Sequence, residues 1–170
     1  IEDADLFIYN GAGLEPWVEQ RLLPVLENSG VKVVNASTGQ NLIHLEPESE
    51  AEHAHAHAGG QGYDPHFWLD PTMAQKTVEE ISRALIAVDP SGEQYYRDNT
   101  ESYTQELQDL DREFSAAAKE FERREFVTSH SAFAYLARRY GLTQVAVLGL
   151  SPDAQPSPGQ IKEVVDFVRT

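Results

Sequence analysis

Two histidines of this chain stand where the backbone changes direction, and their surroundings suit metal binding. His66 lies in the segment Tyr-Asp-Pro-His-Phe-Trp-Leu-Asp-Pro, residues 63–71, between a polar loop and a predicted helix. The two prolines restrict the backbone, and Asp64 or Asp70 could accept the second imidazole N–H, as carboxylates do behind histidine ligands. The alternative is a partly buried loop histidine that bonds to the backbone.

His130 follows a predicted strand at residues 126–129 and precedes a predicted helix at residues 132–140. It therefore stands at the carboxyl end of a strand, the edge at which open α/β sheets bind ligands. The alternative is a helix-capping or core histidine. Because a long helix separates the two positions in the sequence, His66 and His130 together predict a site between two lobes.

Three further histidines, His53, His55 and His57, alternate with alanine and follow four glutamates. This composition suits weak, multivalent metal capture by imidazoles near neutral pH. An internal, interleaved tract is unlike a purification tag, which is an uninterrupted run at a terminus. A solvated loop with incidental histidines remains the alternative.

The composition narrows the classes of partner. The 170 residues include 28 acidic and 13 basic side chains, a formal charge of −15, which disfavours nucleic acid and anionic membranes. Cysteine is absent, so a metal ion must be bound by histidine and carboxylate. Ser131 beside His130 lacks a nucleophile-elbow motif, and Asn-Gly-Ala-Gly at residues 10–13 is only a weak match to a dinucleotide loop.

The elements that must position these residues follow a βα rhythm. The apolar run at residues 6–9, a helix that begins at Pro16 and a strand at residues 31–34 form a βαβ unit, which implies a parallel sheet. Asp70 and Pro71 fit the N-cap and first position of the next helix, which continues to Val88.

One long helix is predicted between two βα regions. Apolar residues between positions 93 and 122 recur every three or four residues, which indicates a helix of about 45 Å. A strand, a helix and a second strand at residues 144–148 follow, and Ser157 with Gln160 forms a capping box for the last helix. We expect the tyrosines and Trp17, at helical spacing, to be core residues.

In this order the motifs resemble one family. They are the strand and turn at residues 4–17, the His-rich acidic loop, the segment around His66, the long helix, and Ser-His-Ser-Ala-Phe at residues 129–133. They are similar to the zinc-binding substrate-binding proteins of bacterial ABC transporters, the cluster A-I (cluster 9) metal-binding family. The resemblance covers nearly the whole chain and identifies it as a central fragment.

The resemblance implies an α/β fold with two βα lobes joined by a long rigid helix, here incomplete at both ends. It divides the chain into part of an amino-terminal lobe (1–88), a linking helix (89–123) and the first part of a carboxyl-terminal lobe (124–170). It implies a periplasmic or membrane-tethered receptor, not an enzyme, that captures zinc and delivers it to an ABC permease.

The resemblance also assigns the ligands. His66 and His130 are carried over as metal ligands, and imidazole at position 130 favours zinc over manganese. The remaining ligands are expected before Ile1 and after Thr170, so we expect these residues to bind zinc more weakly than a complete protein. A surface adhesin of the same family and a zinc-dependent hydrolase remain as alternative functions.

Overall fold

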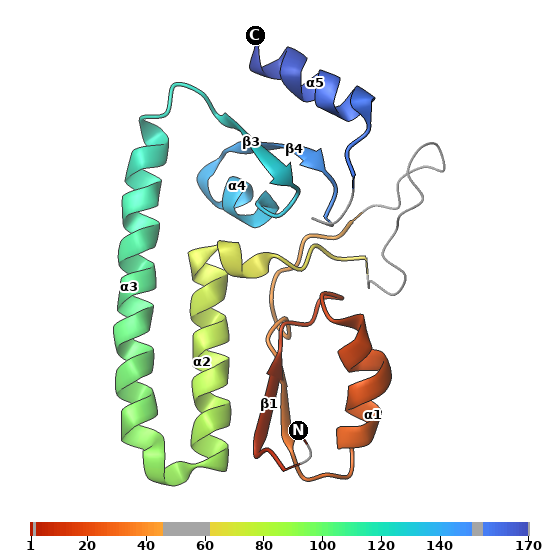
Figure 1. Ribbon diagram of the computed structural model, residues 1–170. Coiled ribbons are helices and arrows are strands. Elements are labelled where there is room, and N and C mark those ends of the chain that lie inside the picture. The colour runs from red at the N-terminus through yellow and green to blue at the C-terminus, as the bar shows by residue number, and fades with distance from the viewer. Residues whose placement is uncertain (2, 46–61, 151–154, 170) are drawn as a thin grey trace. The chain divides into compact units, whose positions relative to one another are not determined.

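The computed structural model describes residues 1, 3–45, 62–150 and 155–169. They form two compact units, Ile1–Asp109 and Leu110–Thr170, and the boundary between them falls inside the long helix α3 (Glu93–Lys119). Figure 1 shows the order of the elements. No helix among the described residues is both long enough and apolar enough to cross a membrane.

The first unit contains the predicted βαβ arrangement. Strands β1 (Leu6–Tyr9) and β2 (Lys32–Asn35) pair in parallel, with Tyr9 opposite Asn35 at their carboxyl ends. The connecting helix is a π-helical turn (Val18–Leu22) that runs into α1 (Leu23–Leu26). Pro24 has no N–H with which to continue an α-helical ladder, which accounts for the wider turn before it.

Helix α2 (Pro71–Val88) begins where the sequence predicts. The Asp70 side chain accepts a hydrogen bond from the Thr72 backbone N–H, and Pro71 occupies the first helical position. A short 3₁₀ turn, Phe67–Leu69, precedes the cap, and α2 packs against both strands of the sheet. In Figure 1 the strands lie between α2 and α1. The start of α2 therefore fixes the segment that carries His66.

The long helix is confirmed, although it is shorter than predicted. A 3₁₀ turn, Pro90–Gly92, connects α2 to α3, which has 27 residues and ends at Lys119 rather than near residue 122. The Arg124 guanidinium donates to the carbonyl of Ala118, so a side chain satisfies one of the last helical acceptors at 2.7 Å.

The second unit has its own parallel pair, β3 (Glu125–His130) and β4 (Thr143–Leu148), with α4 (Ala134–Tyr140) between them in sequence and α5 (Pro158–Val168) after them. Two predicted boundaries were wrong. Strand β3 extends to His130, which pairs with Leu148, and α4 begins two residues late. The capping box of α5 is confirmed.

The prediction that the tyrosines and Trp17 are core residues holds only in part. Tyr9, Tyr135 and Tyr140 are buried, whereas Trp17 is 53% exposed and Tyr95 is 69% exposed. Each of these two exposed side chains precedes a neighbour that faces the protein, and successive residues of a helix point about 100° apart. Helical spacing alone therefore did not identify the buried face.

Candidate metal site

His66 is a buried histidine held by a buried carboxylate. The His66 Nδ1 atom lies 2.8 Å from Oδ1 of Asp64, and the His66 backbone N–H donates to the same oxygen at 2.9 Å. Asp64 is 1% exposed and His66 is 8% exposed. This geometry fits an Nδ1–H donated to the carboxylate, an arrangement that fixes the ring orientation and makes Nε2 the nitrogen for a metal ion.

The carboxyl end of β1 contacts the His66 segment directly. Asn10, the residue after β1, donates from Nδ2 to the carbonyl of Pro65 at 3.1 Å and to the carbonyl of Gly11 at 3.2 Å. The Glu15 carboxylate accepts the backbone N–H groups of Asn10 and Gly11, both at 3.1 Å. The turn after β1 is thus held from inside and bonded to the residue before His66.

The same turn also packs against the end of β2. The Ala12 N–H donates to Oγ of Ser37, whose hydroxyl donates to Oδ1 of Asn35 at 2.7 Å. Gly11 has a φ of +76°, and a Cβ built on it would lie 2.0 Å from Oδ1 of Asn35. Only glycine fits this close approach.

Aromatic side chains and a helix cap complete the surroundings of His66. The Trp68 ring lies 5.4 Å from the imidazole, centroid to centroid, and the Phe67 side chain is fully buried. Asp70 accepts from the N–H and the hydroxyl of Thr72, at 2.9 and 2.7 Å. Of the two predicted supporting carboxylates, the structure thus places Asp64 on the His66 ring and Asp70 on the start of α2.

A short antiparallel bridge stands immediately before the Asp64–His66 pair. His44 pairs with Tyr63, the Leu45 N–H donates to the Gly62 carbonyl at 2.7 Å, and the Asp64 N–H donates to the Ile43 carbonyl at 3.0 Å. We call residues 43–45 and 62–64 the neck. The predicted auxiliary ligands that lie between its two halves, His53, His55 and His57, fall outside the described residues.

His130 belongs to the second unit, where it is the last residue of β3 and is partly buried. Its backbone carbonyl accepts hydrogen bonds from Nε2 of Gln144 at 2.9 Å and from the Thr128 hydroxyl at 2.8 Å. Strand pairing and these bonds fix the backbone of His130 at the carboxyl edge of the β3–β4 pair. The strand-end position predicted from the sequence is therefore correct.

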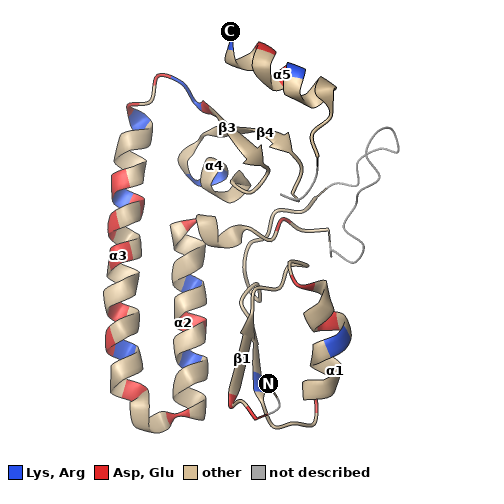
Figure 2. Cartoon of the chain, in the orientation of Figure 1, with Lys and Arg blue, Asp and Glu red and all other residues tan. Residues whose placement is uncertain are grey.

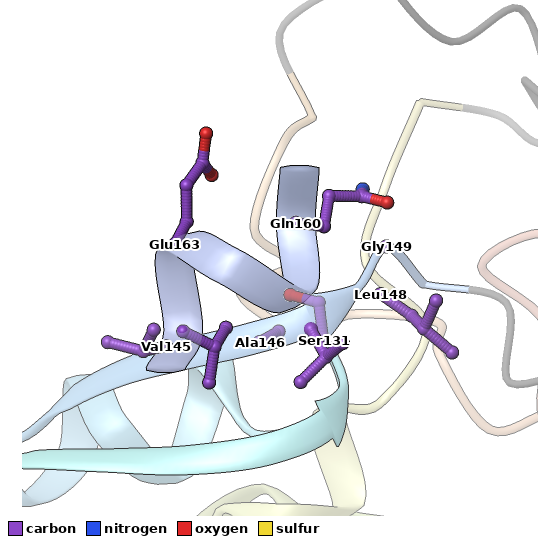
Figure 3. Close-up of a pocket in the computed structure, with 9 residues that line it drawn as sticks. Ser131, Val145, Ala146, Leu148, Gly149, Gln160 and Glu163 are labelled. Atoms are coloured by element: carbon purple, nitrogen blue, oxygen red, sulfur yellow. The ribbon is translucent and has the colours of Figure 1, made fainter. Parts of the chain in front are cut away.

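The described residues contain no group of three or more side chains placed to hold a metal ion together. A hollow of about 370 Å³ lies in the second unit between α5 and β4 (Figure 3). Most of its lining is apolar, Gln160 is engaged in the capping box, and Glu163 points away from the strand. Convergent polar groups are thus missing there, so the His66 pocket is the stronger candidate site.

The sequence did not single out the residues that support His66 from β1. Asn10 and Glu15 were visible only as part of a weak dinucleotide-like turn, and His44 was not considered beyond its place in the His-rich stretch. The signal that could have found Asn10 is an Asn-Gly pair directly after a buried strand. No sequence pattern showed that it would bond to a residue 55 positions away.

The comparisons with known proteins agree with this geometry. Residues 1–170 match the family described as the zinc-uptake complex component A, periplasmic, and the chain belongs to this family. It is 44% identical over 170 residues to the high-affinity zinc uptake system protein ZnuA of Bacillus subtilis, covering 99% of this chain and 53% of that protein. The chain thus spans about half the length of this relative.

Solved structures give the same result. The Zn(II)-bound ZnuA-like domain of Streptococcus pneumoniae AdcA is similar with a TM-score of 0.76 at 37% identity, covering 99% of this chain and 57% of that one. The laminin-binding protein Lmb of Streptococcus agalactiae, described as having adhesin and metal-transporting activity, matches with a TM-score of 0.80 at 34% identity, covering 99% and 58%. The predicted α/β fold is confirmed, and the family is one of solute-binding receptors rather than enzymes.

Proposed function

We propose that this chain is part of an extracytoplasmic zinc receptor, which captures the ion and delivers it to an ABC permease. The observation that carries the proposal is the buried Asp64–His66 pair at the carboxyl edge of the first sheet. The names of the relatives support the identity of the ion and the transport role. Zinc is the cargo here, and the chain itself is proposed to have no catalytic activity.

In this proposal His66 and His130 are zinc ligands, one from each compact unit. Imidazole nitrogen suits zinc, a borderline ion, whereas manganese prefers carboxylate and water oxygen. Asp64 raises the basicity of His66 and holds its ring. The loop histidines His53, His55 and His57 are proposed to bind zinc loosely, and α3 is proposed to be the rigid element between the lobes.

Zinc titration in competition with a chelator tests the ligand assignment. We expect His66→Ala and His130→Ala each to weaken zinc binding at least ~10-fold, since even outer-shell changes have effects of this size. His44→Ala is the matched control, because His44 is an exposed histidine of the neck and is expected to leave tight binding unchanged. Unchanged zinc affinity in His66→Ala would refute the proposal.

The same proteins test the metal and the class of function. Manganese is expected to displace little zinc from the chain at equal concentration. Zinc-dependent turnover in a hydrolase screen, lost in His130→Ala, would instead assign an enzyme, since catalytic zinc keeps an open position for water.

Adhesion is a second candidate function, because the similar protein Lmb is described as an adhesin with metal-transporting activity. Laminin binding by this chain, measured with and without a chelator, tests it. Metal-independent saturable binding would support adhesion as a separate role. Binding no greater than that of an unrelated acidic protein would exclude it.

A further inference from the structure

Asn10 lies far from His66 in the sequence, but it bonds to the peptide group from which His66 projects. Its Nδ2 atom donates to the carbonyl of Pro65, the residue directly before His66. The contact is part-buried and joins the end of β1 to the metal-site segment. Asn10 therefore touches neither the imidazole nor a bound ion, and any effect it has on metal binding must act through the backbone.

The Pro65–His66 peptide plane is held at both ends. Asn10 bonds to its C=O at 3.1 Å, and Asp64 accepts its N–H at 2.9 Å. Because a peptide group is planar and rigid, fixing both ends fixes its rotation about the chain. That rotation sets the direction in which the Cα–Cβ bond of His66 leaves the backbone. Asp64 then sets the rotation of the ring through Nδ1.

Asn10 is itself held in place. The two backbone N–H groups that Glu15 accepts belong to Asn10 and Gly11, and the Asn10 side chain also donates to the Gly11 carbonyl. The positive φ of Gly11 and its close approach to Asn35 fix this turn against β2. The amide of Asn10 is thus preorganised by the sheet rather than by the His66 segment.

We propose that Asn10 is a positioning residue for the His66 metal ligand: by bonding to the Pro65 carbonyl, it sets the backbone orientation that aims the imidazole. The inference rests on the proposed function, since it takes His66 as a ligand. Two supports divide the work. Asp64 orients the ring, and Asn10 orients the peptide that carries it, so the loss of either one misaligns the coordinating nitrogen.

The test uses Asn10→Leu, which keeps the side-chain volume and removes the amide donor, in the 170-residue chain. We expect zinc affinity, measured by chelator competition, to fall about 10-fold, as for other supports of ligand residues. Asn99→Leu is the matched control, because Asn99 is an exposed asparagine on α3, and it is expected to bind zinc as the unchanged chain does.

A second readout separates positioning from a loss of folding. In ¹H–¹⁵N spectra of the metal-free protein, Asn10→Leu is expected to shift the His66 backbone amide and ring nitrogens, while urea unfolding remains a single cooperative loss of the same amplitude. Asn10→Asp, which also lacks the donor, is expected to show the same amide shift. A zinc affinity within twofold of the unchanged chain, or unshifted His66 signals, would overturn the inference.

His66→Ala in the same series distinguishes the two levels of failure. If His66→Ala retains tight zinc binding, the proposed function fails and the role of Asn10 fails with it. If His66→Ala loses zinc and Asn10→Leu does not, the ligand assignment stands and only the positioning role is wrong.

Discussion

At the scale of single residues, the Asp64–His66 pair combines burial with a polar function. A buried carboxylate is unfavourable unless it is bonded, and Asp64 accepts both the backbone N–H and the ring Nδ1 of His66. Its neighbours in sequence supply little freedom, because Pro65 fixes its own φ. The pair is therefore a preformed support that does not need a metal ion to assemble.

Replacing Asp64 tests this support. Asp64→Asn keeps the size and an acceptor oxygen but removes the charge that raises the basicity of His66. We expect zinc affinity to fall about 10-fold to 100-fold, the range for supports behind histidine ligands. Isothermal titration measures it, and Asp5→Asn, an exposed carboxylate before β1, is the control. Equal affinity in Asp64→Asn would mean that Asp64 only caps the local backbone.

The residue scale also shows the limits of the sequence. Asp64 and Asp70 stand two and four residues from His66, and both were candidates to support it. The structure separates them by geometry, since Asp70 has the extended backbone of an N-cap and accepts from Thr72. Sequence spacing does not determine backbone dihedrals, and these decide which way each carboxylate points.

At the scale of elements, the turn after β1 depends on one glycine. Gly11→Ala would place a Cβ 2.0 Å from Oδ1 of Asn35 at a φ of +76°. Gly39→Ala is the matched control, since Gly39 has a φ of +72° and nothing within 4 Å of its Cβ position. We expect Gly39→Ala to destabilise by about 1 kcal/mol through backbone strain alone.

We expect Gly11→Ala to destabilise by roughly 1–3 kcal/mol more than Gly39→Ala, since overpacking adds to strain. Urea unfolding of both variants measures the difference. The same Gly11 variant is expected to lose zinc affinity, because the turn carries Asn10. Equal unfolding midpoints for the two variants would show that Asn35 moves away at little cost.

The second unit is anchored to the carboxyl half of α3 by an ion pair. Arg139 of α4 donates from Nε and Nη2 to Asp111, at 2.9 and 2.6 Å, and the Tyr140 hydroxyl donates to the same carboxylate at 3.1 Å. These bonds, first of all those from Arg139, hold the pKa of Asp111 below its ordinary value. The Phe114 ring packs on Tyr140 at 4.3 Å beside them.

This pair gives a pH-dependent prediction. Because the pKa of Asp111 is lower in the folded state, its ionised form stabilises the fold above the ordinary carboxyl range, and this contribution is lost as the pH falls through the folded pKa. Asp111→Asn is expected to lower the free energy of unfolding by about 1 kcal/mol at neutral pH, and by less at pH ~3.

Urea unfolding at the two pH values checks it. The exposed pair Lys162–Asp166 on α5 provides the control, since Asp166→Asn is expected to change stability little at either pH. A loss in Asp111→Asn that does not depend on pH would assign the effect to packing rather than charge.

The elements themselves were largely predictable. Apolar runs closed by glycine identified β1 and β2, the Asp-Pro pair placed the start of α2, and Ser157 with Gln160 placed α5, because these signals act within a few residues. The exposed side of α3 and the link from Asn10 to Pro65 were not predictable. They depend on which segments pack together, which a single sequence does not state.

At the scale of the whole molecule, negative charge is spread over the chain rather than concentrated at His66. Figure 2 shows acidic residues along much of α3, where they outnumber the basic ones. With a net charge of −15, the protein attracts cations over distances set by the salt concentration, since exposed charges are screened within about 8 Å at physiological ionic strength.

Zinc association is therefore expected to depend on salt. The association rate should fall several-fold between about 0.01 M and 1 M sodium nitrate, while the dissociation rate changes little. Trp68, beside His66, provides a fluorescence signal for stopped flow, and Trp17→Phe removes the other tryptophan. An association rate independent of salt would show that the local pocket alone governs capture.

The neck also separates the length of a segment from the geometry of the site. Its paired backbones join residues 43–45 to residues 62–64 just before His66, so the spacing of Asp64 and His66 is set on the near side of the bridge. Closing a longer loop is inexpensive, at about 0.6 kcal/mol for each doubling of length. Residues 45 and 62 thus mark an insertion point, where peptides of different length or composition can be exchanged while the metal-site segment keeps its register.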